Sequence, residues 1–232
     1  REYVDLERLY AVTGNSVDSY YGFTKMLWLK QHQPEVWADT RYLLPPNSYI
    51  NWCLTGELAV DHSSAGNMGG VYDVAQRGWS QEMLAALGIP LAMMPERVVY
   101  SGEVVGELRD AWATRLGLAA GMPVLAGGVD AAMATLAAGV TQPGNHVAMI
   151  GTSMCWGYLN QQVDAHHGLV SFPHVYNGQR DLYIFGGAIT AGASVSWFRE
   201  QFCQAEEQQA RATGQDSLVL LEERAMKIPA GS

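Results

Sequence analysis

The chain has 232 residues, of which 48% are hydrophobic and 16% are charged, a composition typical of globular proteins that bury a core. Its formal net charge of −9 argues against non-specific nucleic-acid binding, which needs a basic surface to neutralise phosphates. Three widely spaced cysteines favour a reduced, cytoplasmic setting over a disulfide framework or a zinc site, and no apolar run is long enough to span a membrane.

The first half of the chain is predicted to be mostly helical. Apolar residues at helical spacing predict a helix within residues 21–34. A second helix is expected over 47–57, with Asn47 or Ser48 as its N-cap and Gly56 as its stop.

The clearest helix signal lies in residues 79–90. Ser80 is a favourable N-cap there, and Gly88 is the residue type that most often follows the last helical turn. The preceding segment, 61–73, is rich in small and polar residues and is predicted to be a loop.

The second half of the chain has a different pattern of predicted secondary structure, with consecutive strands followed by helices. A domain boundary near residues 128–140 fits both halves. The predicted elements are a strand at 101–108, a helix at 109–118, a buried strand at 121–128, a helix from 131 to about 139, strands at 146–153, 155–162, 168–175 and 181–187, and helices at 190–202, 206–214 and 216–227.

Asp130 is the strongest candidate functional residue in this pattern. It follows Gly127 and Gly128 and stands at the start of an alanine-rich helix. A carboxylate there is stabilised by the helix dipole, so a plain N-cap is one interpretation. The other is a functional acid, because the glycines would let a second molecule approach the backbone and ligands bind where strands of α/β proteins end.

Two further glycine-containing turns follow predicted strands. Backbone N–H groups of "IGTSM" (150–154), with the hydroxyls of Thr152 and Ser153, could hold a phosphate, although an ordinary β-turn is the alternative. The second turn opens "GGAITAGASVSW" (186–197). Together they indicate a nucleotide facing a hydroxyl substrate.

Other reactive side chains have simpler interpretations. His166 and His167 are adjacent, which is poor spacing for sharing a metal ion on a strand, so surface or turn positions are expected. Cys155 has no evident histidine partner and is expected to be a small buried residue rather than a nucleophile. No protein-bound metal site is predicted.

Several segments, in order, resemble the FGGY family of carbohydrate kinases. Each segment alone would be weak evidence, but the series is specific and covers nearly the whole chain. The segments are "TGNSVDSYYGFTKMLWL" (13–29), "YINWCLTGELAVDHSSAG" (49–66), "LGIPLAMMPERVVYSGEVVGEL" (87–108), "GMPVLAGGVDAAMATLAAGVTQPG" (121–144) and the "IGTS" that follows.

The resemblance implies an α/β architecture, the actin-like (ribonuclease H-like) two-domain kinase fold, partial at both ends. Residues 1–127 look like the second half of the N-terminal domain, and residues 128–232 look like the first half of the C-terminal domain. We therefore expect the isolated chain to be inactive as an enzyme.

The same resemblance implies roles for individual residues. Asp130 matches the catalytic aspartate, which contacts the attacking sugar hydroxyl and accepts its proton, and Tyr20 matches a tyrosine that touches the substrate in glycerol kinases. Ala131 departs from the polar residue that glycerol kinases and xylulokinases have beside the aspartate. The positions that match the ATP site are Gly151, Thr152, Gly192 and Ser196.

The implied function is ATP-dependent phosphorylation of a sugar or polyol hydroxyl, with Mg²⁺ and ATP as cofactors. Asp130 would be the general base. The expected partner is a small sugar or polyol rather than nucleic acid or membrane, and the resemblance is compatible with a homodimer. Two alternatives stay open at this point: a non-catalytic actin-like domain that binds a nucleotide or a partner, and a purely structural or interaction domain.

Overall fold

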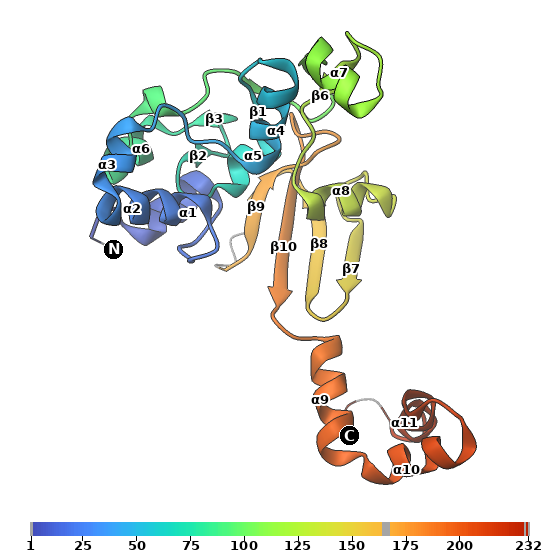
Figure 1. Cartoon of the computed structure of the whole chain (residues 1–232). Coiled ribbons are helices and arrows are strands. Elements are labelled where there is room, and N and C mark those ends of the chain that lie inside the picture. Colours follow the sequence, from blue (N-terminus) through green and yellow to red (C-terminus); the bar gives the residue numbers. More distant parts are fainter. Residues whose placement is uncertain (1, 164–167, 230, 232) are drawn as a thin grey trace. The chain divides into compact units, whose positions relative to one another are not determined.

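The computed structural model describes residues 2–163, 168–229 and 231, which form two compact units (Figure 1). The larger unit comprises Arg1–Val147 and Trp156–Gly186, and the smaller comprises Ala148–Cys155 and Gly187–Ser232. His166 and His167 lie outside the described residues. Within the described ranges, no helix is both long enough and apolar enough to cross a membrane.

The larger unit contains more helix than strand, in line with the helices predicted for the first half of the chain. They are α1 (Leu6–Thr13), α2 (Gly22–His32), α3 (Pro34–Asp39), α4 (Pro46–Thr55), α5 (His62–Asn67), α6 (Gln81–Leu87), the 3₁₀ turn η1 (Leu91–Met93), α7 (Asp110–Leu116) and α8 (Asp130–Ala137).

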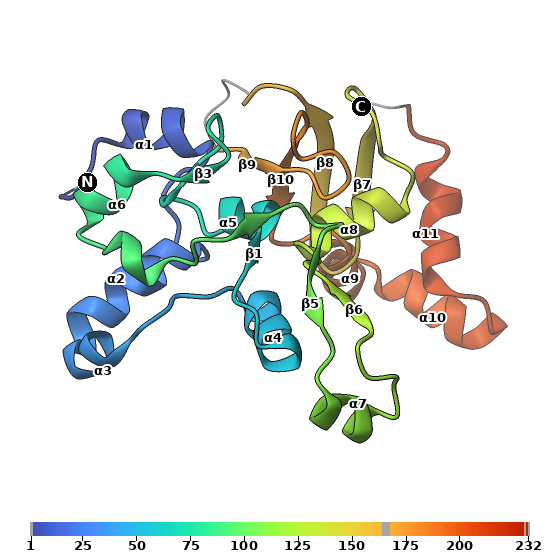
Figure 2. The same cartoon turned by 90° about the horizontal axis from the view of Figure 1, so that it is seen from above.

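Within the described residues, the strands form one four-stranded sheet and three short pairs. The four-stranded sheet has the order β7-β8-β10-β9, with β9 and β10 antiparallel. The pairs are parallel β1-β4, antiparallel β2-β3 and antiparallel β5-β6, whose connection contains α7 (Figure 2). The strands are β1 (Val60–Asp61), β2 (Tyr72–Asp73), β3 (Gly78–Trp79), β4 (Val98–Val99), β5 (Val104–Glu107), β6 (Pro123–Leu125), β7 (His146–Ile150), β8 (Met154–Asn160), β9 (Val170–Pro173) and β10 (Leu182–Ala188).

Local capping chemistry sets the ends of several helices. The side chain of Ser80 accepts a hydrogen bond from the backbone N–H of Met83 at 3.3 Å, and Gly88 ends α6 with φ of 62°, as predicted. Gly56 likewise ends α4 in the left-handed conformation. The predicted cap of α4 is wrong, because the helix begins at Pro46 after Pro45 rather than at Asn47 or Ser48.

Two segments differ from the sequence-based expectations. Residues 61–73, predicted as a loop, contain helix α5, because the carboxylate of Asp61 accepts the backbone N–H of Ser64 at 2.9 Å and caps it. The strand predicted at 121–128 shrinks to β6, whose residues Pro123 and Leu125 are exposed rather than buried. Among the described residues β6 pairs with β5 alone, so it belongs to a two-stranded antiparallel pair and not to the parallel sheet with two covered faces in which such a strand is buried.

The main core of the larger unit joins the helices to the β9–β10 pair. Leu9 of α1, Phe23 of α2 and Leu84 of α6 are buried with Phe172 of β9 and Tyr183 of β10. The core therefore combines residues from both halves of the sequence. It includes Ala132 of α8, and α5 packs on Phe172 through Gly66. Both helices contribute to the site described below.

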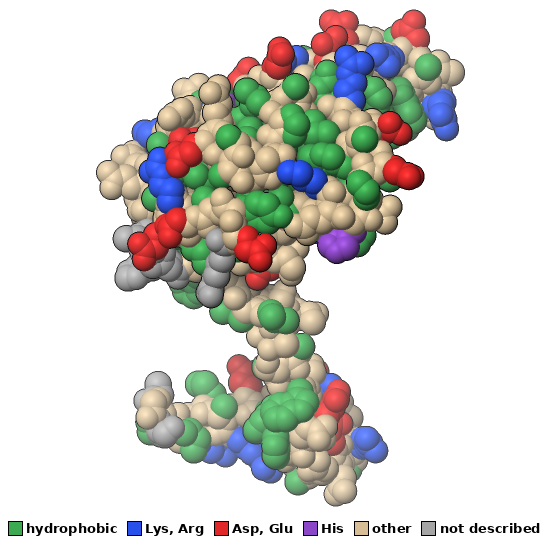
Figure 3. Space-filling view, turned by 90° about the vertical axis from the view of Figure 1, so that its left-hand side faces the viewer, with side chains coloured by type: hydrophobic (Ala, Val, Ile, Leu, Met, Phe, Trp, Pro, Cys, Tyr) green, Lys and Arg blue, Asp and Glu red, His purple; other side chains and the backbone are tan. Residues whose placement is uncertain are grey.

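The smaller unit consists mainly of three helices, α9 (Gly192–Phe202), α10 (Gln204–Thr213) and α11 (Ser217–Ala225). All three are predicted by the sequence to within a few residues. Aromatic side chains of α9 are exposed: Trp197 at 57%, Phe198 at 50% and Phe202 at 61%. Hydrophobic side chains are visible on the surface of this unit in Figure 3.

His174, which follows β9, makes stability depend on pH. Its side chain is 2% exposed, and neither ring nitrogen has a hydrogen-bond partner among the described residues. Burial lowers the pKa of His174 from 6.5 to about 4, and the negative charge of Asp181, which acts to raise this pKa, only partly offsets the effect. The folded state therefore holds a neutral imidazole, whereas the unfolded chain binds a proton below about pH 6.5.

The free energy of unfolding should consequently fall as the pH drops from about 6.5 to about 4, with His174 contributing up to about 3 kcal/mol of the loss. Urea unfolding at pH 7 and pH 4.5 measures this. In His174→Phe the difference between the two pH values should shrink, whereas His32→Phe, at an exposed position, should behave like the wild type. An undiminished pH dependence in His174→Phe would rule out this assignment.

Candidate functional site

Asp130 lies in a pocket of the larger unit. It is the first residue of α8, with Val129 rather than Asp130 as the N-cap, and its Oδ1 accepts the backbone N–H of Ala131 at 2.7 Å. The side chain is exposed and lines a pocket of about 700 Å³. Asp130 is therefore an accessible carboxylate at a helix start, and the N-cap interpretation is wrong.

Four segments of the larger unit surround this pocket. They are the region from Tyr20 into α2, residues 43–47, helix α5 and the loop before α8. Aliphatic side chains form much of the wall, and a few polar groups lie among them, as in small-molecule sites. The lining residues are Tyr20, Gly22, Lys25, Met26, Leu29, Leu43, Leu44, Pro45, Pro46, Asn47, Ser64, Asn67, Met68, Gly128, Val129 and Asp130.

Tyr20, the predicted substrate residue, lines the same pocket as Asp130. Its side chain is 47% exposed, and its hydroxyl donates to Oδ1 of Asn67 at 3.1 Å. The ammonium group of Lys25 donates to the carbonyl oxygens of Ser19 at 3.0 Å and Tyr21 at 3.3 Å. These bonds hold the turn that presents Tyr20 to the pocket.

Tyr21 fixes the other side of that turn. Burial raises the pKa of Tyr21 far above its usual value, so the phenol stays protonated, and it donates to Oδ1 of Asn15 at 3.0 Å. The amide of Asn15 in turn donates to the carbonyl of Ser171 on β9 at 3.0 Å. The Tyr20 turn is thus attached to the core sheet through neutral hydrogen bonds.

The two glycines before Asp130 have different roles. Gly127 has φ of 75°, which favours glycine, and a Cβ there would meet nothing within 4 Å. A Cβ at Gly128 would lie 2.6 Å from Cγ1 of Val175 and 2.8 Å from Oγ of Ser63. Gly128 is therefore required by close packing within the protein, although it also lines the pocket. Gly127 is not among the lining residues, and its left-handed backbone is what favours glycine there.

The predicted ATP residues belong to the smaller unit, and three of them meet. The backbone N–H of Gly192 donates to the carbonyl of Gly151 at 2.9 Å, and that of Ala191 donates to the carbonyl of Thr152 at 2.8 Å. A Cβ at Gly192 would lie 2.7 Å from the Gly151 oxygen, so this approach requires glycine. The structure thus brings Gly151, Thr152 and Gly192 together.

The first N–H groups of α9 are already used in this contact. Gly192 and Ala193 donate to the carbonyls of Gly151 and Thr152, so these donors are not available to a phosphate. The exposed hydroxyls of Thr152 and Ser153 remain accessible. Ser196 lies about one turn into α9 and is exposed.

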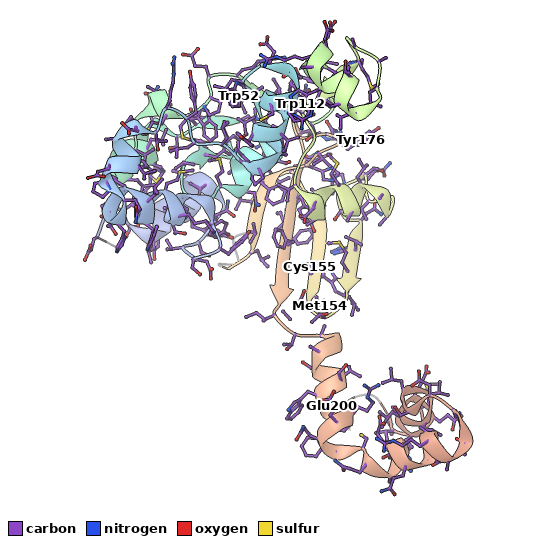
Figure 4. All side chains as sticks on the ribbon, viewed as in Figure 1. Trp52, Trp112, Met154, Cys155, Tyr176 and Glu200 are labelled. Carbon is purple, nitrogen blue, oxygen red and sulfur yellow. The ribbon has the colours of Figure 1, made fainter. Side chains whose placement is uncertain are left out.

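Other residues considered from the sequence do not form a site. Cys155, labelled in Figure 4, lies on β8 and is half-buried rather than fully buried. Within the described part of the chain, no group of three or more His, Cys, Asp and Glu side chains is placed to hold a metal ion.

The sequence interpretation missed several polar groups of the pocket. Asn47 was expected only as a cap, Asn67 fell in a predicted loop, and Lys25 in a predicted helix. Ser64 likewise fell in the loop. The sequence did contain one local indication for Asn47. Proline is favoured at the first position of a helix, so Pro45 and Pro46 can start α4 without a cap from Asn47, which leaves the Asn47 side chain available for another role.

Comparisons with known proteins agree on one family. The profile of the N-terminal domain of the FGGY family of carbohydrate kinases matches residues 1–137. The chain is 31% identical over 227 residues to the autoinducer-2 kinase of Klebsiella pneumoniae, an alignment that covers 97% of this chain and 42% of that protein. The chain thus spans less than half the length of this relative.

Solved structures support the same fold. The xylulose kinase from Rhodospirillum rubrum matches with a TM-score of 0.85 and 27% identity, over 98% of this chain and 44% of that one. The glycerol kinase from Plasmodium falciparum, solved with ADP, matches with a TM-score of 0.75 and 17% identity, over 88% of this chain and 42% of that one, which supports the fold alone. The α/β, actin-like fold implied by the sequence resemblance is confirmed as part of a larger structure. The family profile matches more than half of this chain, which shows that the chain belongs to the FGGY family of carbohydrate kinases.

Proposed function

We propose that this chain is the central part of a kinase that transfers a phosphoryl group from ATP to a hydroxyl of a small sugar or polyol. The observation that supports this most strongly is the pocket of about 700 Å³ in which the exposed carboxylate of Asp130 and the hydroxyl-bearing side chain of Tyr20 are both lining residues. Family membership supplies the reaction class.

Asp130 would bind the acceptor hydroxyl and take its proton late in the reaction. Phosphoryl transfer proceeds through a loose transition state, so the protein mainly orients the reacting groups and stabilises charge. A positioned carboxylate contributes about 10²–10⁴-fold to such a step. The exposed position of Asp130 at the start of α8 leaves its carboxylate open to the acceptor hydroxyl.

Gly151, Thr152, Gly192 and Ser196 would face the nucleotide. The exposed hydroxyls of Thr152 and Ser153 fit phosphate oxygens, and the tight contact of Gly192 with Gly151 gives the turn a defined shape. ATP would supply the phosphoryl group when bound, and Mg²⁺ would be held chiefly by its phosphates and water. This activity would belong to the cytoplasm and would need the longer protein, so the isolated chain should be inactive.

A panel assay tests the proposal. The full-length protein that contains this chain would be mixed with ATP, Mg²⁺ and, one at a time, pentuloses, polyols, aldoses, gluconate and autoinducer-2, and ADP formation would be measured. We expect ADP formation above the no-acceptor control with at least one compound. Binding of ATP without acceptor-dependent ADP formation across the panel would favour a non-catalytic nucleotide-binding protein.

A further inference from the structure

Asp61, at the end of β1, is a buried carboxylate without an assigned role. Its side chain is 1% exposed. It accepts hydrogen bonds from the side-chain amide of Asn47 at 2.8 Å, the backbone N–H of Ser64 at 2.9 Å and the hydroxyl of Ser63. All three donors are neutral. Burying a carboxylate is costly even with such partners, so its position calls for an explanation beyond capping a six-residue helix.

Ser63 connects Asp61 to the backbone that holds Asp130. The Ser63 side chain is also 1% exposed. Its hydroxyl donates to Asp61, which leaves the oxygen free to accept the backbone N–H of Val129 at 3.1 Å. Val129 is the N-cap of α8 and directly precedes Asp130. Two successive hydrogen bonds therefore run from the buried carboxylate to the residue beside the proposed base.

The second oxygen of Asp61 is hydrogen-bonded to another part of the pocket lining. Oδ2 accepts from Nδ2 of Asn47, and Oδ1 of Asn47 accepts from the hydroxyl of Ser64 at 3.3 Å. Asn47 and Ser64 both line the pocket that contains Asp130. The Asp61 carboxylate thus orients the Asn47 amide directly, and through Ser63 it also orients the backbone at Val129, the residue before Asp130.

We propose that Asp61 is a positioning residue, which acts through Ser63 on the backbone at Val129 and thereby holds Asp130 in line with the acceptor hydroxyl. This inference rests on the proposed function, in which Asp130 is the base. A carboxylate suits the position because both of its oxygens can accept hydrogen bonds, and its partners Asn47, Ser63 and Ser64 are all donors. An amide at position 61 would turn a donor toward one of those donors.

The expected effect follows from the sensitivity of catalysis to geometry. A displacement of about 1 Å can cost about 100-fold in rate. Ser63→Ala removes the link to Val129 but leaves Asp61 as the cap of α5 and its bond to Asn47. In the full-length kinase we expect kcat to fall by about 10- to 100-fold with KM changed by less than about threefold. Asp61→Asn should lower kcat at least as much.

Two measurements, kcat and amide hydrogen exchange at Val129, together with a matched control variant, distinguish a positioning role from a general loss of stability. Amide hydrogen exchange at Val129 should be faster in Ser63→Ala, because its acceptor is gone. Ser171→Ala is the control, since Ser171 is equally buried but its hydroxyl has no hydrogen-bond partner among the described residues. It should leave kcat and the exchange at Val129 unchanged.

Wild-type kcat in Ser63→Ala, with or without faster exchange at Val129, would overturn the proposal. Because Ser63→Ala is a small subtractive change, the test does not depend on Asp61→Asn being stably folded. If the wild-type protein forms no ADP with any acceptor, the proposed function fails instead. In that case the exchange rate at Val129 still decides whether Ser63 holds this loop.

Discussion

Replacing Asp130 with Asn in the full-length kinase should lower kcat by about 10²–10⁴-fold while ATP affinity changes by less than about twofold. The amide has nearly the same shape and can still accept the Ala131 N–H that Oδ1 accepts in the wild type. It cannot accept a proton from the acceptor hydroxyl. Acceptor-dependent ADP formation measures kcat, and titration with an ATP analogue measures nucleotide affinity.

Asp110→Asn is the matched control for this variant. Asp110 is also the first residue of a helix, α7, and is also exposed, but it is not among the residues that line the pocket. Its replacement removes the same favourable interaction with a helix dipole, about 0.3–1 kcal/mol, without touching the reacting groups. Wild-type turnover in Asp130→Asn would remove Asp130 from the mechanism.

Replacing Phe172 with Ala should lower the free energy of unfolding by about 3–5 kcal/mol. Phe172 is fully buried in β9, and its ring centroid lies 5.5 Å from that of Tyr183 and 6.0 Å from that of Phe185. Helix α5 packs directly on it, since a Cβ at Gly66 would lie 2.6 Å from Cβ of Phe172. The side chain therefore supports the helix that provides Ser64 and Asn67 to the pocket.

Chemical denaturation of the 232-residue chain measures this loss. Tyr176→Ala is the control, because Tyr176 lies in the same unit, between β9 and β10, and is 65% exposed (Figure 4). It should change the free energy of unfolding by less than about 0.5 kcal/mol. Equal losses in the two variants would contradict the assignment of Phe172 to the core.

Elements with strong local signals could be predicted from the sequence. Helix α6 was predicted because Ser80 caps its first turn and Gly88 ends its last turn, and both residues are next to the helix in the sequence. Helix α5 was missed because its six residues are mostly small or polar, and its stability depends on the Asp61 cap and on packing against Phe172. The latter contact joins residues more than 100 positions apart, which no local pattern reveals.

The candidate site was predictable to a similar extent. Asp130 could be found from the glycines and helix start around it, and the resemblance to the kinases added Tyr20, which the structure places in the same pocket. The contributions of Asp61 and Ser63 could not be predicted. They depend on where β1 and α5 lie relative to the loop before α8, and the spacing of 66 residues between Ser63 and Val129 gives no indication of their hydrogen bond.

A crystal structure of the full-length protein with its accepted sugar or polyol and a non-hydrolysable ATP analogue would test the central claim most directly. The account predicts that the acceptor lies in the pocket lined by Tyr20, Asn47 and Asp130, with the reacting hydroxyl about 2.6–3.2 Å from a carboxylate oxygen of Asp130. An acceptor bound outside this pocket, or with its reacting hydroxyl turned away from Asp130, would contradict it.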